Sequence, residues 1–301
     1  MTFTKTISNI ELTTHTGITS KFITSGLFRT IAITGVVKNL KIDGLTLNVS
    51  YSITDTSSAN YTYTIGIVSG ENARYIENVS VTNSKILGSG IKNVNKNTFN
   101  IGGLVGSNSR AIINSYILDS TIDFSITHDK TDILKVGGLV GYGSNNSTIL
   151  NSYSVGSMKI ITNVTNSTIY LGGIVGELST NSAYIINSYT FFSLTAINES
   201  ESYKSLHHFG PVVGLNSNFS DPNKVFNKTF YDMNFQDFYS SGITSFNLNW
   251  DGDYTEGKNF KGDFTFTTWD TNSYNSINNT NPWSDDIWTF STNDSHYPIH
   301  H

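Results

Sequence analysis

The chain has 301 residues, a formal net charge of −5 and no cysteine, and only 14% of its residues are charged. The missing cysteines exclude disulfides and thiolate metal sites, and 18 Lys and Arg residues are too few to form a nucleic-acid-binding surface. Because Thr, Ile, Val, Tyr and Phe abound while Ala, Glu and Gln are scarce, the composition favours an all-β protein.

The N-terminal residues contain neither a basic region nor an apolar run of signal-peptide length. No segment approaches the roughly 18 consecutive apolar residues of a membrane-spanning helix. We therefore expect no membrane span. Residues 1–35 precede the first clear repeat and are predicted to form an N-terminal capping segment, because terminal repeats of stacked proteins are usually degenerate.

Two short blocks recur in phase along the middle of the chain. The first is Gly-Gly-(Leu/Ile)-Val-Gly, which begins at Gly102, Gly137 and Gly172, a spacing of 35 residues each time. The second is Asn-Ser-Tyr, at Asn114, Asn151 and Asn187, with degenerate copies at Asn39, Asn78 and Asn227. A repeat of about 36 residues therefore runs through the central region.

Each unit contains three short alternating segments separated by Gly, Asn and Ser turns, which is typical of strands rather than helices. A single unit cannot cover its own apolar face, but stacked units place equivalent residues about 4.8 Å apart and bury that face together. The repeats predict a parallel β-solenoid over residues 36–231, with about five to six coils.

Stacking gives each repeated residue an expected structural role. We expect the glycines to allow tight or left-handed corners and close approach between coils, the asparagines to form amide ladders, and the tyrosines to stack. Serine and threonine are expected to coat the flanks. The predicted rows consist of Gly102, Gly106, Gly137, Gly141, Gly172 and Gly176; Asn114, Asn151 and Asn187; and Tyr116, Tyr153 and Tyr189.

The Gly-Gly-Leu-Val-Gly block followed by Ile-Asn-Ser-Tyr resembles the GLUG repeat. That repeat occurs in bacterial surface proteins, including adhesin-like proteins and the non-catalytic region of some IgA-cleaving metallopeptidases. The resemblance covers roughly residues 25–230 and implies a solenoid at a cell surface. It implies no activity, and the chain has no His-Glu-x-x-His motif that would carry the peptidase function.

Composition changes in residues 232–301, where the repeat is lost. All four tryptophans lie there, which predicts either an aromatic cap over the solenoid end or a small binding module. The candidate ligand-binding residues are Trp250, Trp269, Trp283 and Trp288. Asp251, Asp253 and Glu256 have oxygen ligands at a spacing that would suit a structural Ca²⁺, although an Asp-Gly turn explains them more simply.

Other candidate sites have a simpler structural explanation. His207 and His208 are predicted to lie in a solvated loop rather than in a metal site. The densest acidic group of the repeats is predicted to be a solvated rim rather than a catalytic pair; it consists of Asp119, Asp123, Asp129 and Asp132. We therefore expect no enzyme and no cofactor other than the Ca²⁺ considered above.

The expected function is that of a non-enzymatic, extracellular or cell-surface structural or adhesive protein. Its uncharged polar flanks would bind glycans, bind protein partners or pack against further copies in a homo-oligomer or filament. Two alternatives remain open from the sequence. One is a capsid, fibre or spike component of a virus or phage, and the other is a β-helix enzyme that acts on carbohydrate.

Overall fold

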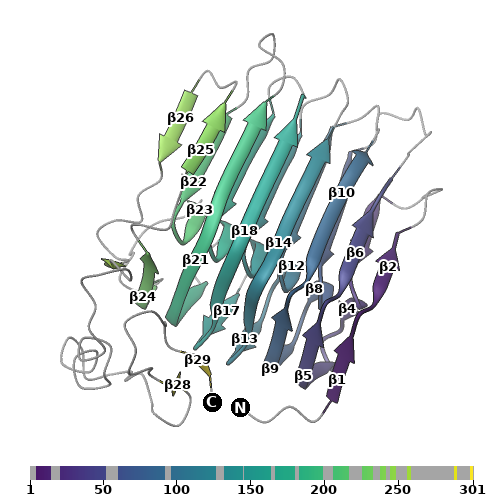
Figure 1. The fold of residues 1–301 in the computed structure, drawn as a ribbon, viewed down its shortest axis with the longest axis vertical. Helices are drawn as coiled ribbons and strands as arrows, with labels where there is room; N and C mark the ends of the chain where they lie inside the picture. Colours follow the sequence, from purple (N-terminus) through teal and green to yellow (C-terminus); the bar gives the residue numbers. More distant parts are fainter. Residues whose placement is uncertain are drawn as a thin grey trace.

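The computed structural model describes residues 5–14, 21–51, 60–91, 96–126, 132–144, 146–163, 167–179, 183–198, 206–216, 226–232, 238–241, 245–248, 256–258, 288–289 and 299–300. These residues form strands, turns and bends, with no helix among them. The strands stack side by side in a parallel array in which the N-terminal β1 and β2 lie at one end and β25 and β26 at the other (Figure 1). The predicted parallel β-solenoid is confirmed.

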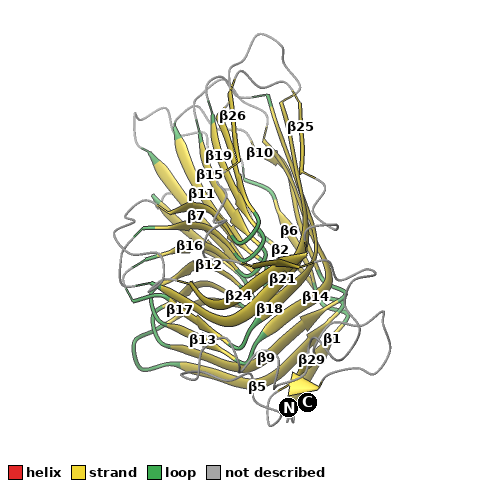
Figure 2. Cartoon of the chain, turned by 90° about the vertical axis from the view of Figure 1, so that its left-hand side faces the viewer, coloured by secondary structure: helices red, strands yellow, loops and turns green. Residues whose placement is uncertain are grey.

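The path of one coil is clearest in the middle of the stack. β11 (Asn97–Gly102) turns sharply into β12 (Val105–Asn108), which leads through β13 (Ala111–Ile113) to the long β14 (Tyr116–Ile126). Each of these strands pairs in parallel with the equivalent strands of the coils before and after it. Repetition of this path produces three parallel sheets, seen along their edges in Figure 2.

We name the three sheets A, B and C. Sheet A has 14 strands: β1 (Lys5–Ser8), β2 (Glu11–Thr13), β5 (Val36–Asp43), β6 (Thr46–Val49), β9 (Tyr75–Thr82), β10 (Lys85–Ile91), β13, β14, β17 (Thr148–Leu150), β18 (Tyr153–Thr162), β21 (Tyr184–Asn198), β24 (Phe226–Asp232), β25 (Phe238–Ser241) and β27 (Glu256–Lys258). Sheet B has seven: β3 (Phe22–Ser25), β7 (Tyr61–Gly66), β11, β15 (Ile133–Gly137), β19 (Thr168–Gly172), β22 (Leu206–Gly210) and β26 (Ser245–Leu248). Sheet C has six: β4 (Phe28–Ile31), β8 (Ser69–Asn72), β12, β16 (Val140–Gly143), β20 (Val175–Leu178) and β23 (Val213–Asn216). A separate antiparallel pair joins β28 (Trp288–Thr289) to β29 (Ile299–His300).

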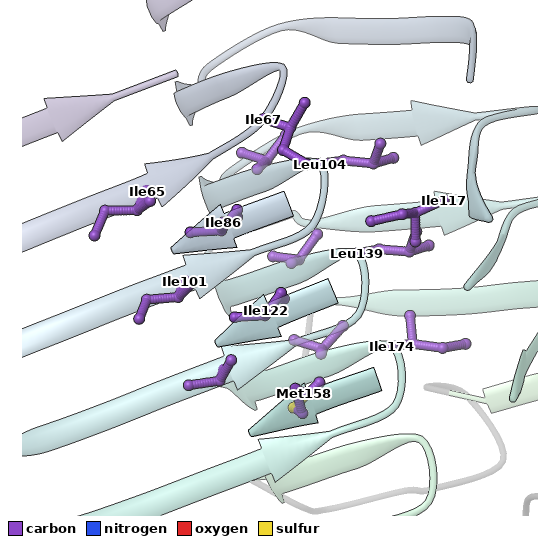
Figure 3. Packing of buried hydrophobic residues seen from close by; sticks show 14 of the residues in the cluster. Ile65, Ile67, Ile86, Ile101, Leu104, Ile117, Ile122, Leu139, Met158 and Ile174 are labelled. Carbon is purple, nitrogen blue, oxygen red and sulfur yellow. The ribbon is translucent and has the colours of Figure 1, made fainter. Parts of the chain in front are cut away.

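The core is a set of apolar rows that run along the stack. Ile86, Ile122 and Met158 occupy equivalent positions in successive coils and are almost completely buried. Figure 3 shows this row beside the parallel row that contains Leu104 and Leu139. Because each coil buries its apolar side chains against the coils on both sides, the hydrophobic stabilisation is distributed along the whole stack.

The repeated glycines line the corner between sheets B and C. Gly102 pairs in register with Gly137, and Gly137 with Gly172. A Cβ atom on Gly137 would lie 2.0 Å from the carbonyl oxygen of Val140, and one on Gly141 would lie 2.3 Å from the backbone nitrogen of Ile101. Gly106, Gly172 and Gly176 meet backbone atoms at similarly short distances. Close approach of two backbones therefore explains these rows.

The asparagines of the repeat adopt left-handed backbone, and the repeated glycines do not. Asn114, Asn151 and Asn187 each have φ of 48°, whereas none of the six glycines of the predicted rows has a positive φ. The Nδ2 atom of Asn151 donates to Oδ1 of Asn114 at 3.0 Å, and Asn187 donates to Asn151 at 3.2 Å. Asparagine suits this position because its short polar side chain tolerates the left-handed region.

The expectation that Asn227 shares the phase of this row is wrong. The structure pairs Asn227 with Ile186, one residue before Asn187, and pairs Thr229 with Ser188. The long insertion before β24 allows this shift, because sheet register is set by the backbone ladder rather than by the identity of the side chain.

The serine after each asparagine is buried, which corrects the expectation that serine coats the flanks. Ser152 Oγ accepts a hydrogen bond from the backbone nitrogen of Ser115 at 3.2 Å and donates to the carbonyl oxygen of Leu150 at 2.8 Å. Ser188 repeats this pattern one coil further along. In a regular ladder a backbone carbonyl would accept the hydrogen bond from this N–H. Where the left-handed asparagine bends the strand, the serine hydroxyl accepts it instead.

A row of aromatic rings completes the repeat. Tyr116 and Tyr153 stack with ring centroids 4.5 Å apart, and Tyr153 and Tyr189 with centroids 4.9 Å apart, in both cases nearly parallel. Tyr153 and Tyr189 are almost completely buried. The pKa of Tyr116 is raised, because the effect of burial outweighs that of the hydrogen bonds that lower it. Tyr116 therefore stays neutral at physiological pH.

Candidate functional site

The most distinctive side chains outside the core lie where sheets B and C meet. On sheet B, Asn100, Lys135, Tyr170 and His208 occupy the same register position in four successive coils. They alternate along their strands with core residues, so they lie on the face of sheet B opposite the core. Sheets B and C run in different directions (Figure 2) and are joined by the short turn that follows Gly102 in β11 and its equivalents in the neighbouring coils.

Sheet C contributes a matching row. Ser107, Tyr142 and Glu177 share one register position in three successive coils. We call the set formed by Asn100, Lys135, Tyr142, Tyr170, Glu177 and His208 the corner surface.

Lys135 joins the two sheets across the corner. Its Nζ atom lies 2.9 Å from Oε2 of Glu177 and 4.0 Å from the centre of the Tyr142 ring. The side chains of Lys135 and Glu177 are only 14% and 12% exposed, so solvent screens this ion pair less than a fully exposed one. The pair and the cation–π contact fix the orientation of the Tyr142 ring.

Tyr170 and His208 extend the corner surface toward the C-terminal coils. Their ring centroids lie 5.0 Å apart. Burial raises the pKa of Tyr170, and the negative charge of Glu177 raises it further. Burial lowers the pKa of His208 below its usual value. Both rings are therefore neutral near pH 7.

Asn100 adds a buried acceptor beside Lys135. Its side chain is only 5% exposed, and its Oδ1 atom accepts no hydrogen bond from any described residue. A buried amide oxygen that lacks a donor costs about 1–3 kcal/mol of stability.

The corner surface offers half-buried aromatic rings, a carboxylate and amide oxygens that accept hydrogen bonds, and an ammonium group that donates them. Rings and paired polar groups of this kind suit sugars, which have apolar ring faces and many hydroxyls. Within the described ranges no three His, Asp or Glu side chains gather closely enough to hold a metal ion.

Several residues predicted as sites lie outside the described part of the chain. These are Trp250, Trp269, Trp283, Asp251 and Asp253. Trp288 begins β28 and Glu256 begins β27, and only their backbones are described. The structure therefore brings none of the predicted tryptophans or Ca²⁺ ligands together in a described site.

Two further expectations are corrected. His207 and His208 lie in strand β22 and not in a loop. Asp132, expected on a solvated rim, is completely buried, and its Oδ1 atom accepts hydrogen bonds from the backbone and side-chain nitrogens of Asn97 at 2.9 and 3.2 Å. The donors that Asn97 supplies from the neighbouring coil offset part of the cost of burying this side chain.

Sequence reasoning missed the corner surface, because its residue types change from coil to coil. The signal that was available was the spacing: Lys135 lies two residues before Gly137, and Tyr170 lies two residues before Gly172. No helix in the described ranges has the length and apolarity needed to cross a membrane. The chain gives no match to a family model, to a curated protein or to a solved structure.

Proposed function

We propose that the protein is a non-enzymatic extracellular or cell-surface structural and adhesive protein that binds glycans on the corner surface. The observation that supports this proposal most directly is that the corner surface holds two aromatic contacts near the Lys135–Glu177 ion pair: Tyr142 lies under Lys135, and Tyr170 packs against His208. A rigid scaffold that holds aromatic rings and paired polar groups loses little conformational entropy when it binds.

A non-enzymatic role also fits the chemistry of this surface. Glycoside hydrolysis usually uses two carboxyl groups that flank the scissile bond at about 5–10 Å. The corner surface contains a single carboxyl group, that of Glu177, which is engaged by Lys135 at 2.9 Å. We therefore favour binding over catalysis as its role.

We also propose that the chain is a divergent member of the GLUG-repeat surface proteins. The support is the register: the Gly-Gly-(Leu/Ile)-Val-Gly blocks and the Asn-Ser-Tyr blocks each stack on themselves in successive coils. Membership of this family would place the chain at a cell surface.

Glycan binding is tested by screening the labelled full chain against an array of neutral and acidic glycans. For a glycan that binds, we expect Tyr170→Ala to raise the Kd about two- to tenfold, because a stacked ring contributes about 0.5–1.5 kcal/mol. Tyr184→Ala is the matched control, because Tyr184 is an exposed tyrosine on sheet A, away from the corner.

The control variant should bind like the unmodified chain. The proposal fails if the unmodified chain binds no glycan, or if Tyr184→Ala weakens binding as much as Tyr170→Ala. Release of reducing sugar from an array polysaccharide would instead favour the enzymatic alternative.

A further inference from the structure

The corner between sheets B and C has a free edge at the N-terminal end of the stack. β3 and β4 are the first strands of these two sheets, and among the described strands each pairs only with the strand of the next coil. A free edge of this kind offers backbone N–H and C=O groups to another chain and invites unwanted pairing. The side chains at this edge therefore decide whether a further coil can stack there.

One position of sheet C is glycine in every described coil except the first. The register aligns Arg29 of β4 with Gly70 of β8, because the residues on either side of them pair with each other. The same register joins Gly70 to the equivalent glycine of each following coil. The row consists of Gly70, Gly106, Gly141, Gly176 and Gly214. Arginine thus replaces glycine only where the sheet begins.

Glycine is required in the later coils because the preceding coil passes close to this position. A Cβ atom on Gly106 would lie 2.3 Å from the backbone nitrogen of Ile65, and one on Gly141 would lie 2.3 Å from that of Ile101. Ile65 and Ile101 each belong to the sheet B strand of the preceding coil. Two non-bonded atoms cannot approach so closely, so a side chain at this position excludes a preceding coil.

Arg29 fits in the first coil because no described strand precedes β3 and β4 in their sheets. By the geometry of the row, its Cβ atom points toward the place that the sheet B strand of a preceding coil would occupy. The side chain is exposed, and its Nε atom donates a hydrogen bond to Oγ1 of Thr24 on β3 at 3.4 Å. Arg29 therefore lies against the edge strand of sheet B, where an added coil would have to pack.

We propose that Arg29 terminates the stack by filling the place that a preceding coil would need. A coil supplied by a second copy of this chain would meet the same clash, so β3 and β4 cannot extend their ladders into another molecule. Protection of this kind keeps a stacked protein from growing into a fibre through its sheet edges. The inference concerns the end of the stack and does not depend on glycan binding.

Lengthening the stack by one coil tests the proposal within a single chain. A copy of residues 97–131 inserted directly before Lys21 supplies one complete coil, and it meets Lys21 in the register that Asp132 has in the natural chain. The copied Ile101 would then face Arg29, as the original Ile101 faces the glycine of its next coil. The added coil therefore fits only if residue 29 has no side chain.

Three lengthened chains are compared: one keeps Arg29, and the others carry Arg29→Gly or Arg29→Ala. A single Cβ atom is enough for the clash, so we expect Arg29→Gly to accept the added coil and the other two to resist it. In urea, the equilibrium constant for unfolding should be at least about tenfold lower for Arg29→Gly than for Arg29→Ala. Without the added coil the order should reverse, because glycine stabilises a strand less than alanine does. Equal stability of the three lengthened chains, whether high or low, would overturn the proposal.

The same copy inserted between Thr131 and Asp132 is the control. Glycine already occupies the critical position in the coils on both sides of this point, so the chain should remain stable with Arg29 unchanged. A loss of stability as large as that caused by the insertion before Lys21 would contradict the proposal, because the cost of a coil would then not depend on Arg29.

A reciprocal pair of substitutions in the natural chain provides a second measurement. Gly141→Ala should lower the urea midpoint strongly, because the backbone of the preceding coil passes over this position. Arg29→Ala should leave the midpoint almost unchanged, because no described strand precedes β3 and β4 there. Equal losses in the two variants would show that the first coil is packed like the others and would overturn the proposal.

Discussion

At the scale of single residues, left-handed backbone forms two rows of corners, one along most of the stack and one confined to the first four coils. The first uses the same amino acid every time, in the row of Asn39, Asn78, Asn114, Asn151 and Asn187. The second uses whatever residue tolerates a positive φ, and it is formed by Asn9, Gly44, Asn83 and Asp119. In both corners a buried serine follows in several coils and bonds to backbone groups of two coils. The serine hydroxyl is therefore a structural group of the fold.

We expect Ser152→Ala to lower the free energy of unfolding by about 1–3 kcal/mol. The change leaves the buried backbone N–H of Ser115 without its acceptor, whereas the carbonyl of Leu150 loses the hydroxyl but still accepts a hydrogen bond from the backbone nitrogen of Asn114 at 3.0 Å. Urea unfolding measures the difference. Ser89→Ala is the control, because Ser89 is exposed and its loss should cost less than about 0.5 kcal/mol. Equal effects of the two substitutions would refute the structural role of Ser152.

At the scale of the element, one coil is the unit of the fold. The glycine corner recurs after 35 residues between Gly102 and Gly137, and the strands on either side keep their register across that interval. Because each coil contacts mainly its two neighbours, the sequence of one coil is replaceable by another that matches its register.

We expect deletion of residues 103–137 to leave a folded protein with one coil fewer. The deletion joins Gly102 to Gly138, keeps the Gly-Gly-Leu-Val corner and brings β11 next to β16 in the order that the fold requires. Deletion of residues 103–138 is the control. It removes one more residue and shifts the corner by one position, which would turn core side chains outward. Circular dichroism and urea unfolding should show a stable first variant and a disrupted second one; equal stability of both would contradict this interpretation.

The organisation of the coil explains how much of the structure could be predicted from the sequence. The solenoid and its repeat length were predictable because two positions keep the same residue type in successive coils. These are the glycine position of Gly137 and the asparagine position of Asn151, and the backbone at each admits few other residues. The corner surface was not predictable, because the outer position of sheet B accepts Asn100, Lys135 or Tyr170 without any change in the backbone ladder. The buried position of Asp132 was missed because the hydrogen-bond donors of Asn97 come from another coil and leave no local pattern.

At the scale of the whole molecule, stability should vary along the stack. Coils in the middle contact a coil on each side, whereas β1 and β2 pair with single strands among those described. The residues of β1 are also largely exposed, whereas those of β15 are mostly buried or partly buried. Local opening is therefore easier at the N-terminal end than in the centre.

Hydrogen exchange measured on a dilute sample tests this gradient. We expect the backbone amides of residues 5–13 to exchange much faster than those of residues 97–102 and 133–137, because the end strands open without disturbing the central coils. Uniform protection along the chain would instead indicate that the solenoid unfolds as a single cooperative unit.

The parallel ladders also determine how the protein responds to mechanical force. The hydrogen bonds between coils run along the stack, so tension applied between β1 and β27 pulls directly on them rather than shearing the strands past one another. Such a load peels the stack one coil at a time from its ends. Each coil of about 36 residues releases roughly 120 Å of extended chain when it detaches. A tether built in this way lengthens in steps and dissipates energy, while the coils that remain keep their structure.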